Sequence, residues 1–151
     1  MKQSVELIHD YPYPAERLWH VVTDFGFLEE VVAGVISFRG LPKGKVALGQ
    51  KIEVGVSLFG VLPYQPYEME LLALDSQNYT FHSLEKGAGV RAWEHHLKVE
   101  NTANGSRLVE KIVIDAGLLT PIFKLWATFL YKKRHIPRLD ILKRITKGTA
   151  A

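Results

Sequence analysis

The sequence of 151 residues contains no cysteine, so disulfides, thiolate metal ligands and cysteine nucleophiles are excluded. It also lacks any stretch near the roughly 20 apolar residues that cross a bilayer, and its N-terminus lacks the apolar run of a signal peptide. Both absences favour a soluble, cytoplasmic protein. No repeat, low-complexity tract or linker interrupts the chain, so we expect residues 1–151 to form a single domain.

Several chemical motifs are missing as well. The sequence has no glycine-rich phosphate-binding motif and no serine nucleophile elbow. The adjacent residues His95 and His96 would point to opposite faces of a strand, so this pair does not predict a metal site. We therefore expect no metal, no cofactor, and neither nucleotide nor acyl-serine chemistry.

Positive charge is concentrated near the C-terminus. The chain carries a formal charge of +3, but the segment from residue 121 onwards carries +7, which leaves −4 on the rest. A basic helix can meet the phosphates of lipid or nucleic acid, although a charge run is also the ordinary solvated face of a helix. We expect no nucleic-acid partner and at most a weak contact with a membrane surface, while the oligomeric state stays open. The basic residues are Lys124, Lys132, Lys133, Arg134, Arg138, Lys143, Arg144 and Lys147.

Alternating apolar and polar residues predict that most of the chain forms β-strands. A first strand is predicted at 5–9, and Pro14 then suits the start of a short helix at 15–23. Asp24 would cap a second short helix at 25–32. Because tight turns and no helices separate the later strands, the sheet should be antiparallel. These strands are predicted at 35–39, 51–58, 67–74, 78–85, 90–101 and 106–115.

A long helix is predicted to end the chain. Thr120 would cap it, Pro121 would be its first residue, and it would run to Lys147 with a kink or break at Pro137. At about 1.5 Å per residue it would measure roughly 40 Å, so it must lie across the sheet. Together these elements predict an α+β fold. A curved antiparallel sheet wraps round the long C-terminal helix, two short helices follow strand 1, and an apolar cavity is enclosed. The helix has a broad apolar stripe made of Ile122, Leu125, Trp126, Phe129 and Leu130.

Two polar residues fall on apolar strand faces. Alternation places His95 on the face of Trp93 and Leu97, and it places Glu110 on a face with three large aliphatic residues. A buried carboxylate has to be protonated, paired or hydrated. His95 is therefore either a core histidine with a satisfied ring or a ligand contact, and the aromatic residues near it are either plain core or the wall of a binding site.

The length of the hairpin turn decides whether the two polar residues can meet. A two-residue turn at 104–105 would set Glu110 opposite Val99, away from His95. A loop of four residues would instead set Glu110 opposite Leu97, diagonal to His95 and about 7 Å away at the backbone, within reach of long side chains. The sequence leaves both registers open.

The order of elements and the motifs of the second half resemble the START-like (SRPBCC, Bet v 1-like) helix-grip family over nearly the whole chain. The resemblance is to bacterial members described as polyketide cyclase/dehydrase and lipid transport proteins. It departs from them where Leu97 replaces a second histidine, Glu110 replaces an aspartate and Ile114 replaces a tyrosine. The matching motifs are Phe81, the turn 87–89, Trp93-Glu94-His95, the run 105–114 and Tyr131-Lys132-Lys133-Arg134-His135.

The resemblance implies binding or transport of a hydrophobic small molecule, such as a lipid, polyketide or isoprenoid-like compound. The alternative is a cyclase, dehydratase or isomerase that uses His95 as acid or base with Glu110 orienting it. The departures make the site more apolar, which favours a non-catalytic binding protein while an enzyme stays open. The predicted ligand-binding residues are Phe81, Trp93, His95, Glu110, Ile112, Ile122, Trp126 and Phe129, with His95 and Glu110 also the catalytic candidates.

Overall fold

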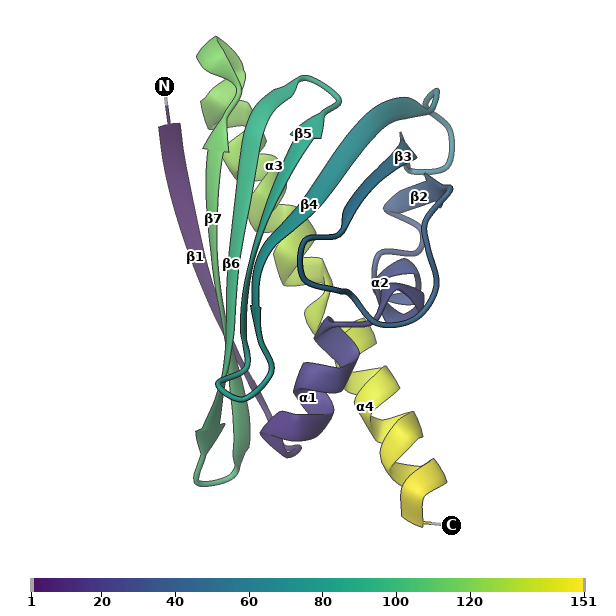
Figure 1. The fold of residues 1–151 in the computed structure, drawn as a ribbon, viewed down its shortest axis with the longest axis vertical. Helices are drawn as coiled ribbons and strands as arrows, with labels where there is room; N and C mark the ends of the chain where they lie inside the picture. The colour runs from purple at the N-terminus through teal and green to yellow at the C-terminus, as the bar shows by residue number, and fades with distance from the viewer. Residues whose placement is uncertain (1, 151) are drawn as a thin grey trace.

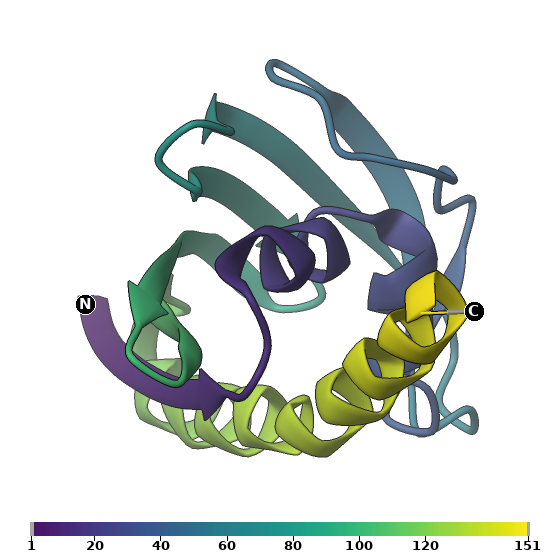
Figure 2. The same ribbon diagram turned by 90° about the horizontal axis from the view of Figure 1, so that it is seen from below.

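The computed structural model describes residues 2–150, the last two of them by their backbone alone. Its centre is one seven-stranded antiparallel sheet in the order β1-β7-β6-β5-β4-β3-β2, which curves round the helices (Figures 1 and 2). This confirms the predicted α+β helix-grip fold. The strands are β1 (Lys2–Tyr11), β2 (Ile36–Arg39), β3 (Lys51–Leu58), β4 (Gln65–Asp75), β5 (Thr80–Gly87), β6 (Val90–Thr102) and β7 (Gly105–Asp115).

The helices lie in two groups, one after β1 and one at the C-terminal end. The first group begins after the prolines that end β1, and the Asp24 side chain caps α2 by accepting from the backbone N–H of Gly26 at 2.8 Å. No helix within residues 2–150 is long and apolar enough to cross a membrane. The helices are α1 (Ala15–Val22), α2 (Phe25–Val31), the 3₁₀ turn η1 (Gly117–Leu119), α3 (Thr120–Lys133) and α4 (His135–Ala150).

The predicted long helix is two helices that meet at Arg134. Pro137 has no N–H to bond with the Lys133 carbonyl, and its ring crowds that carbonyl, so the helical ladder is interrupted one turn before the proline. This is the break predicted from the sequence. Thr120 is the first residue of α3 and not its cap; its hydroxyl donates to the Gly117 carbonyl at 2.7 Å and accepts from the Ala116 N–H at 2.9 Å.

The hairpin between β6 and β7 has the register that brings the two polar residues together. Leu97 lies opposite Glu110, as the longer predicted loop requires. The strands continue to the pair Thr102 and Gly105, however, so the turn itself is shorter than that loop. A Cβ at Gly105, whose φ is 149°, would collide with the Tyr11 carbonyl oxygen. Only glycine fits there, which fixes the end of the hairpin beside the end of β1.

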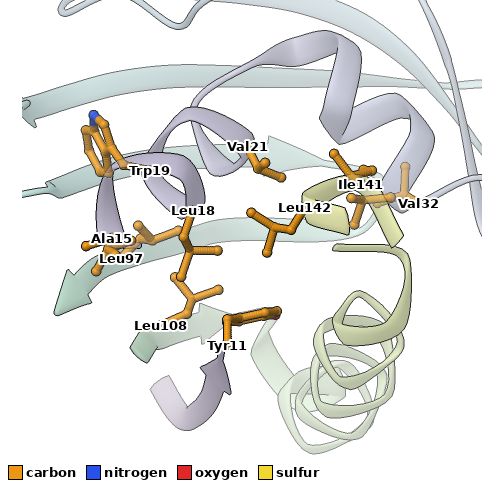
Figure 3. Close-up of a cluster of buried hydrophobic side chains, with 12 residues drawn as sticks. Tyr11, Ala15, Leu18, Trp19, Val21, Val32, Leu97, Leu108, Ile141 and Leu142 are labelled. Atoms are coloured by element: carbon orange, nitrogen blue, oxygen red, sulfur yellow. The ribbon is translucent and has the colours of Figure 1, made fainter. Parts of the chain in front are cut away.

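The buried apolar residues form two clusters, one towards each end of the sheet. One cluster joins α1, α2 and α4 to the sheet and includes Leu18, Leu108 and Leu142 (Figure 3). The other packs α3 on β1, β6 and β7 and includes Ile112 and Leu130. On β6 and β7 the residues between the two clusters are polar, and the functional site begins there.

Candidate functional site

An apolar cavity of about 210 Å³ lies between the concave face of the sheet and the helices. Strands β2 to β6, both short helices and α3 and α4 all contribute side chains to its wall. The wall is mainly aliphatic and aromatic, which is the character of a site for a small apolar molecule. Aliphatic examples are Val21, Val22, Val56, Met69 and Leu71.

A charged network closes one side of this cavity. His95 on β6 bonds through Nε2 to Oε2 of Glu110 on β7 at 2.7 Å, and Nη1 of Arg138 on α4 donates to the Glu110 Oε1 at 3.1 Å. All three residues are buried, and Glu110 has no exposed surface. The network therefore joins two strands and the last helix across the interior.

Arg138 and His95 keep Glu110 ionised. Burial alone would raise the pKa of Glu110, but the charge of Arg138 and the hydrogen bond with His95 outweigh it and hold that pKa well below its usual range. Burial would lower the pKa of Arg138, and the opposing charge of Glu110 raises it instead. An ionised carboxylate can only accept, so His95 must carry its proton on Nε2.

The His95 ring is held in place from several sides. Its centroid lies 5.3 Å from the Phe81 ring and 5.1 Å from the Tyr131 ring, and both contacts are edge-to-face. Tyr131 is in turn bonded to Trp93, whose Nε1 donates to the tyrosine hydroxyl at 3.3 Å. His95 lines the cavity while Glu110 lies behind it, so Glu110 orients the ring without lining the cavity itself.

A second polar group lies on the cavity wall formed by β4 and β5. The Tyr67 hydroxyl donates to Oε1 of Glu85 at 2.9 Å, and the Ser83 hydroxyl donates to Oε2 of Glu85 at 3.4 Å. Burial, followed by the charge of Glu85, raises the pKa of Tyr67 well above its ordinary value, so this tyrosine remains a neutral donor. The cavity thus has donors and acceptors on two walls and apolar side chains elsewhere.

Four predicted site residues, Phe81, Trp93, His95 and Trp126, line the cavity. Two others, Glu110 and Ile112, are fully buried but do not line it. Their role in ligand binding stays a prediction.

Ile122 and Phe129 do not line the cavity. Their exposed fractions are 62% and 40%, and both lie on the outer side of α3. The apolar stripe of this helix is broader than the face that the sheet covers. The covered face follows helical spacing through Phe123, Ala127, Leu130 and Tyr131, which leaves the other half of the stripe outside.

The outer half of this stripe belongs to an exposed apolar patch. The Phe59 ring, from the loop between β3 and β4, packs edge-on against Trp126 of α3 with 5.8 Å between centroids, which brings the loop beside the helix. Trp126 also lines the cavity, so the patch borders the cavity wall. We define the exposed apolar patch as Phe59, Val61, Leu62, Leu118, Leu119, Ile122, Leu125 and Phe129.

One further cluster lies on the outer face of the sheet. His82 of β5 stands directly opposite His96 of β6, with ring centroids 4.0 Å apart, and Glu94 lies beside them. One ligand atom from each residue falls within 4.8 Å of the others. Imidazole nitrogens and a carboxylate are ligands for zinc and related ions, so these residues could hold a divalent metal. The cluster was not predictable from the sequence, because the two histidines are brought together by strand pairing and not by spacing along the chain.

Arg134, Arg138, Tyr67 and Glu85 were also missed as site residues. Arg134 was visible only as part of a motif shared with the resembled family, and Arg138 follows it by one helical turn on the same face. Charge in the last helix indicated a solvated face, and nothing in the pattern marked these two arginines as buried. Arg138 lies four residues after Arg134, which belongs to a matched motif. This spacing is the signal that could have identified Arg138.

Solved structures with a similar fold come from different sources. Protein MLL2253 from Mesorhizobium loti superposes with a TM-score of 0.73 at 16% identity, covering 94% of this chain and 98% of that one. Protein CV1439 from Chromobacterium violaceum gives 0.71 at 12%, covering 90% and 97%. Ara h 8.0201 gives 0.68 at 18%, covering 93% and 99%. The first conclusion is that this protein has the Bet v 1-like (SRPBCC) fold.

Residues 13–140 match the family described as "Domain of unknown function (DUF8410)", and the chain belongs to this family. No curated protein matches the chain. The solved structures share less than 20% of their residues with it and show the fold alone.

We predict that Glu110→Gln lowers the free energy of unfolding at pH 7 by about 3–5 kcal/mol, because it leaves the buried Arg138 charge without its carboxylate. Glu110 has a lowered pKa in the folded state, so its contribution is complete above its ordinary pKa of 4.5 and is lost as the pH falls below that value. Urea unfolding of both proteins should therefore show a gap that shrinks below pH 4.5.

The matched control is Asp10→Asn, which breaks an exposed arginine–carboxylate pair with Arg107 at 2.7 Å. This change should leave the unfolding free energy nearly unchanged, because exposed pairs contribute little. Equal stability of Glu110→Gln and the unaltered protein at pH 7 would contradict the importance of the buried network.

Proposed function

We propose that this protein binds a small hydrophobic molecule in its cavity and carries it. The observation that supports this most directly is the cavity itself, about 210 Å³ with walls that are largely aliphatic and aromatic. Protein interiors normally pack with few voids larger than a water molecule, so a cavity of this size is unusual for a simple core. Its position between a curved sheet and its helices suits a buried ligand.

Apolar and polar side chains of the cavity wall would have different roles in binding. Apolar side chains would supply most of the affinity, because removing apolar surface from water contributes roughly 25 cal/mol of favourable free energy per Å². His95, Tyr67 and Ser83 offer polar contacts on two walls that would fix the orientation of the ligand. The proposed ligand therefore has a mostly apolar body with a few polar atoms.

Filling the cavity should weaken binding. Val56 lines it and is 8% exposed, so Val56→Phe places a phenyl ring in the volume that a ligand needs. Titration with the neutral apolar dye Nile red should show one site in the unaltered protein and affinity roughly tenfold weaker or worse in the variant.

The control for this experiment is Val113→Phe, the same change on the outer face of β7. It should bind Nile red like the unaltered protein, and circular dichroism should show that both variants are folded. Absence of a saturable Nile red site, together with no co-purified apolar molecule on native mass spectrometry, would overturn the proposed function.

We also propose that the ligand is exchanged at a bilayer surface. The exposed apolar patch is large, with Leu118 at 96%, Val61 at 80% and Leu125 at 74% exposure. Exposed apolar side chains in this number are a feature of interaction sites. Lysines border it on α3, and the Lys133 ammonium lies 5.5 Å from the centre of the Phe129 ring. Apolar residues beside lysines suit the interface of an anionic membrane.

Co-sedimentation with vesicles containing phosphatidylserine tests this exchange surface. The protein should bind such vesicles, binding should weaken as salt screens the lysines, and Leu125→Asp should remove most of it. Leu48→Asp is the matched control, because Leu48 is 64% exposed in the loop between β2 and β3 and lies outside the patch. Equal binding of the two variants would contradict a membrane role for the patch.

A second candidate function is acid–base catalysis at His95. The bond of 2.7 Å between His95 Nε2 and Glu110 favours it, because it fixes the tautomer and leaves Nδ1 as a proton acceptor on a ring that lines the cavity. Such a base could abstract a proton next to a ligand carbonyl, as cyclisation, dehydration and isomerisation require.

Nitrogen-15 NMR of the histidine rings tests this candidate. His95 should show a proton on Nε2, because the ionised Glu110 carboxylate can only accept. For any carbonyl compound that is turned over, His95→Ala should abolish turnover while binding persists. A ring without a proton on Nε2, or turnover unchanged in His95→Ala, would remove His95 from the mechanism.

A further inference from the structure

We infer that the ligand carries an anionic head group, a carboxylate or a phosphate, which the buried guanidinium of Arg134 binds while the apolar body occupies the cavity. This inference rests on the proposed function. It adds the chemical class of the ligand and the residue that recognises it.

Arg134 is a buried cation that lines the cavity without an anionic partner. Its exposed fraction is 9%, and its side chain contributes to the cavity wall at the junction of α3 and α4. Within residues 2–150 no carboxylate lies within 4.0 Å of its guanidinium, no hydrogen bond from that group is present, and its buried Nε has no partner. A charge held out of water is costly unless it is paired, so Arg134 calls for an anion.

Three other arginines of the chain have the carboxylate partner that Arg134 lacks. Arg138, one turn further along, is paired with Glu110 at 3.1 Å. The exposed residues Arg107 and Arg144 are paired with carboxylates at 2.7 Å and 3.0 Å. Arg107 and Arg144, which water could also satisfy, thus have carboxylate partners, and the buried Arg134 does not.

The contact that Arg134 does make leaves its N–H groups available. The centre of its guanidinium lies 4.1 Å from the centre of the Tyr131 ring. Stacking of this kind uses the face of the guanidinium and not its edges, where the donors lie. The stack therefore positions a donor edge, and a carboxylate or phosphate can accept two parallel bonds from such an edge.

The nearby carboxylates are already engaged. Glu110 accepts from Arg138 and bonds to His95, and Glu85 accepts from the hydroxyls of Tyr67 and Ser83. Farther round the cavity wall, the Asp24 carboxylate caps α2.

A comparison of head groups tests the inference directly. Isothermal titration at pH 8 would use dodecanoate, dodecyl phosphate and dodecan-1-ol, which share one apolar chain and differ in the head. The unaltered protein should bind at least one anion roughly tenfold or more tighter than the alcohol, because charge-assisted bonds are stronger than neutral ones. Comparing the two anions shows whether a carboxylate or a phosphate is preferred.

Variants of Arg134 assign that preference to its guanidinium. Arg134→Met should remove the preference for the anions over dodecan-1-ol, while Arg134→Lys, which keeps the charge and loses the two-bond edge, should retain part of that preference. Arg144→Met makes the same change at an exposed site on α4, where the side chain is 58% exposed, and should behave like the unaltered protein.

The outcomes separate the inference from the proposed function. Equal affinity for the alcohol and both anions in the unaltered protein would overturn the inference and leave apolar binding standing. A failure of all three compounds to bind would overturn the proposed function as well. If Arg134→Met weakened all three compounds equally, the arginine would act only through the shape of the cavity, and the inference would be wrong.

Discussion

Glu110 is a charged carboxylate with no exposed surface, and the interior is organised round the need to satisfy it. His95 of β6 and Arg138 of α4 bond to its two oxygens, so the last helix is tied to the centre of the sheet. The bonded groups lie where the two apolar clusters meet, with Trp93 and Ile112 on one side and Leu97 and Leu108 on the other. Removing one partner would leave a buried charge, which is why such a network holds its elements in one arrangement.

The same network determines what the cavity can do. It places the proton of His95 on Nε2. The His95 ring and the Arg138 side chain are the parts of the network that line the cavity. Arg134 stands one turn before Arg138 but has no such partner. The two arginines thus have different roles. Arg138 is neutralised by Glu110 within the protein, and Arg134 is the residue that we propose binds the head group of the ligand.

Local patterns in the sequence predicted much of this architecture. Alternation along β6 and β7 predicted that His95 and Glu110 turn inward, and Pro137 predicted the break between the C-terminal helices, because both effects depend on a few neighbouring residues. Features set by packing between distant segments were not predictable. The apolar stripe of α3 was too broad to show which half the sheet covers, so the sequence did not reveal that Ile122 and Phe129 lie on the outer side of the helix.

The break at Arg134 has a mechanical consequence. Helix α3 is attached to the sheet through Ala127, Leu130 and the bond between Tyr131 and Trp93, whereas α4 is attached through Arg138 and the other apolar cluster. Because the backbone ladder is interrupted between them, a change in the tilt of α3 does not have to be transmitted along α4. The cavity wall that carries Trp126 and the ion pair that anchors α4 thus belong to different helices, which a single residue separates.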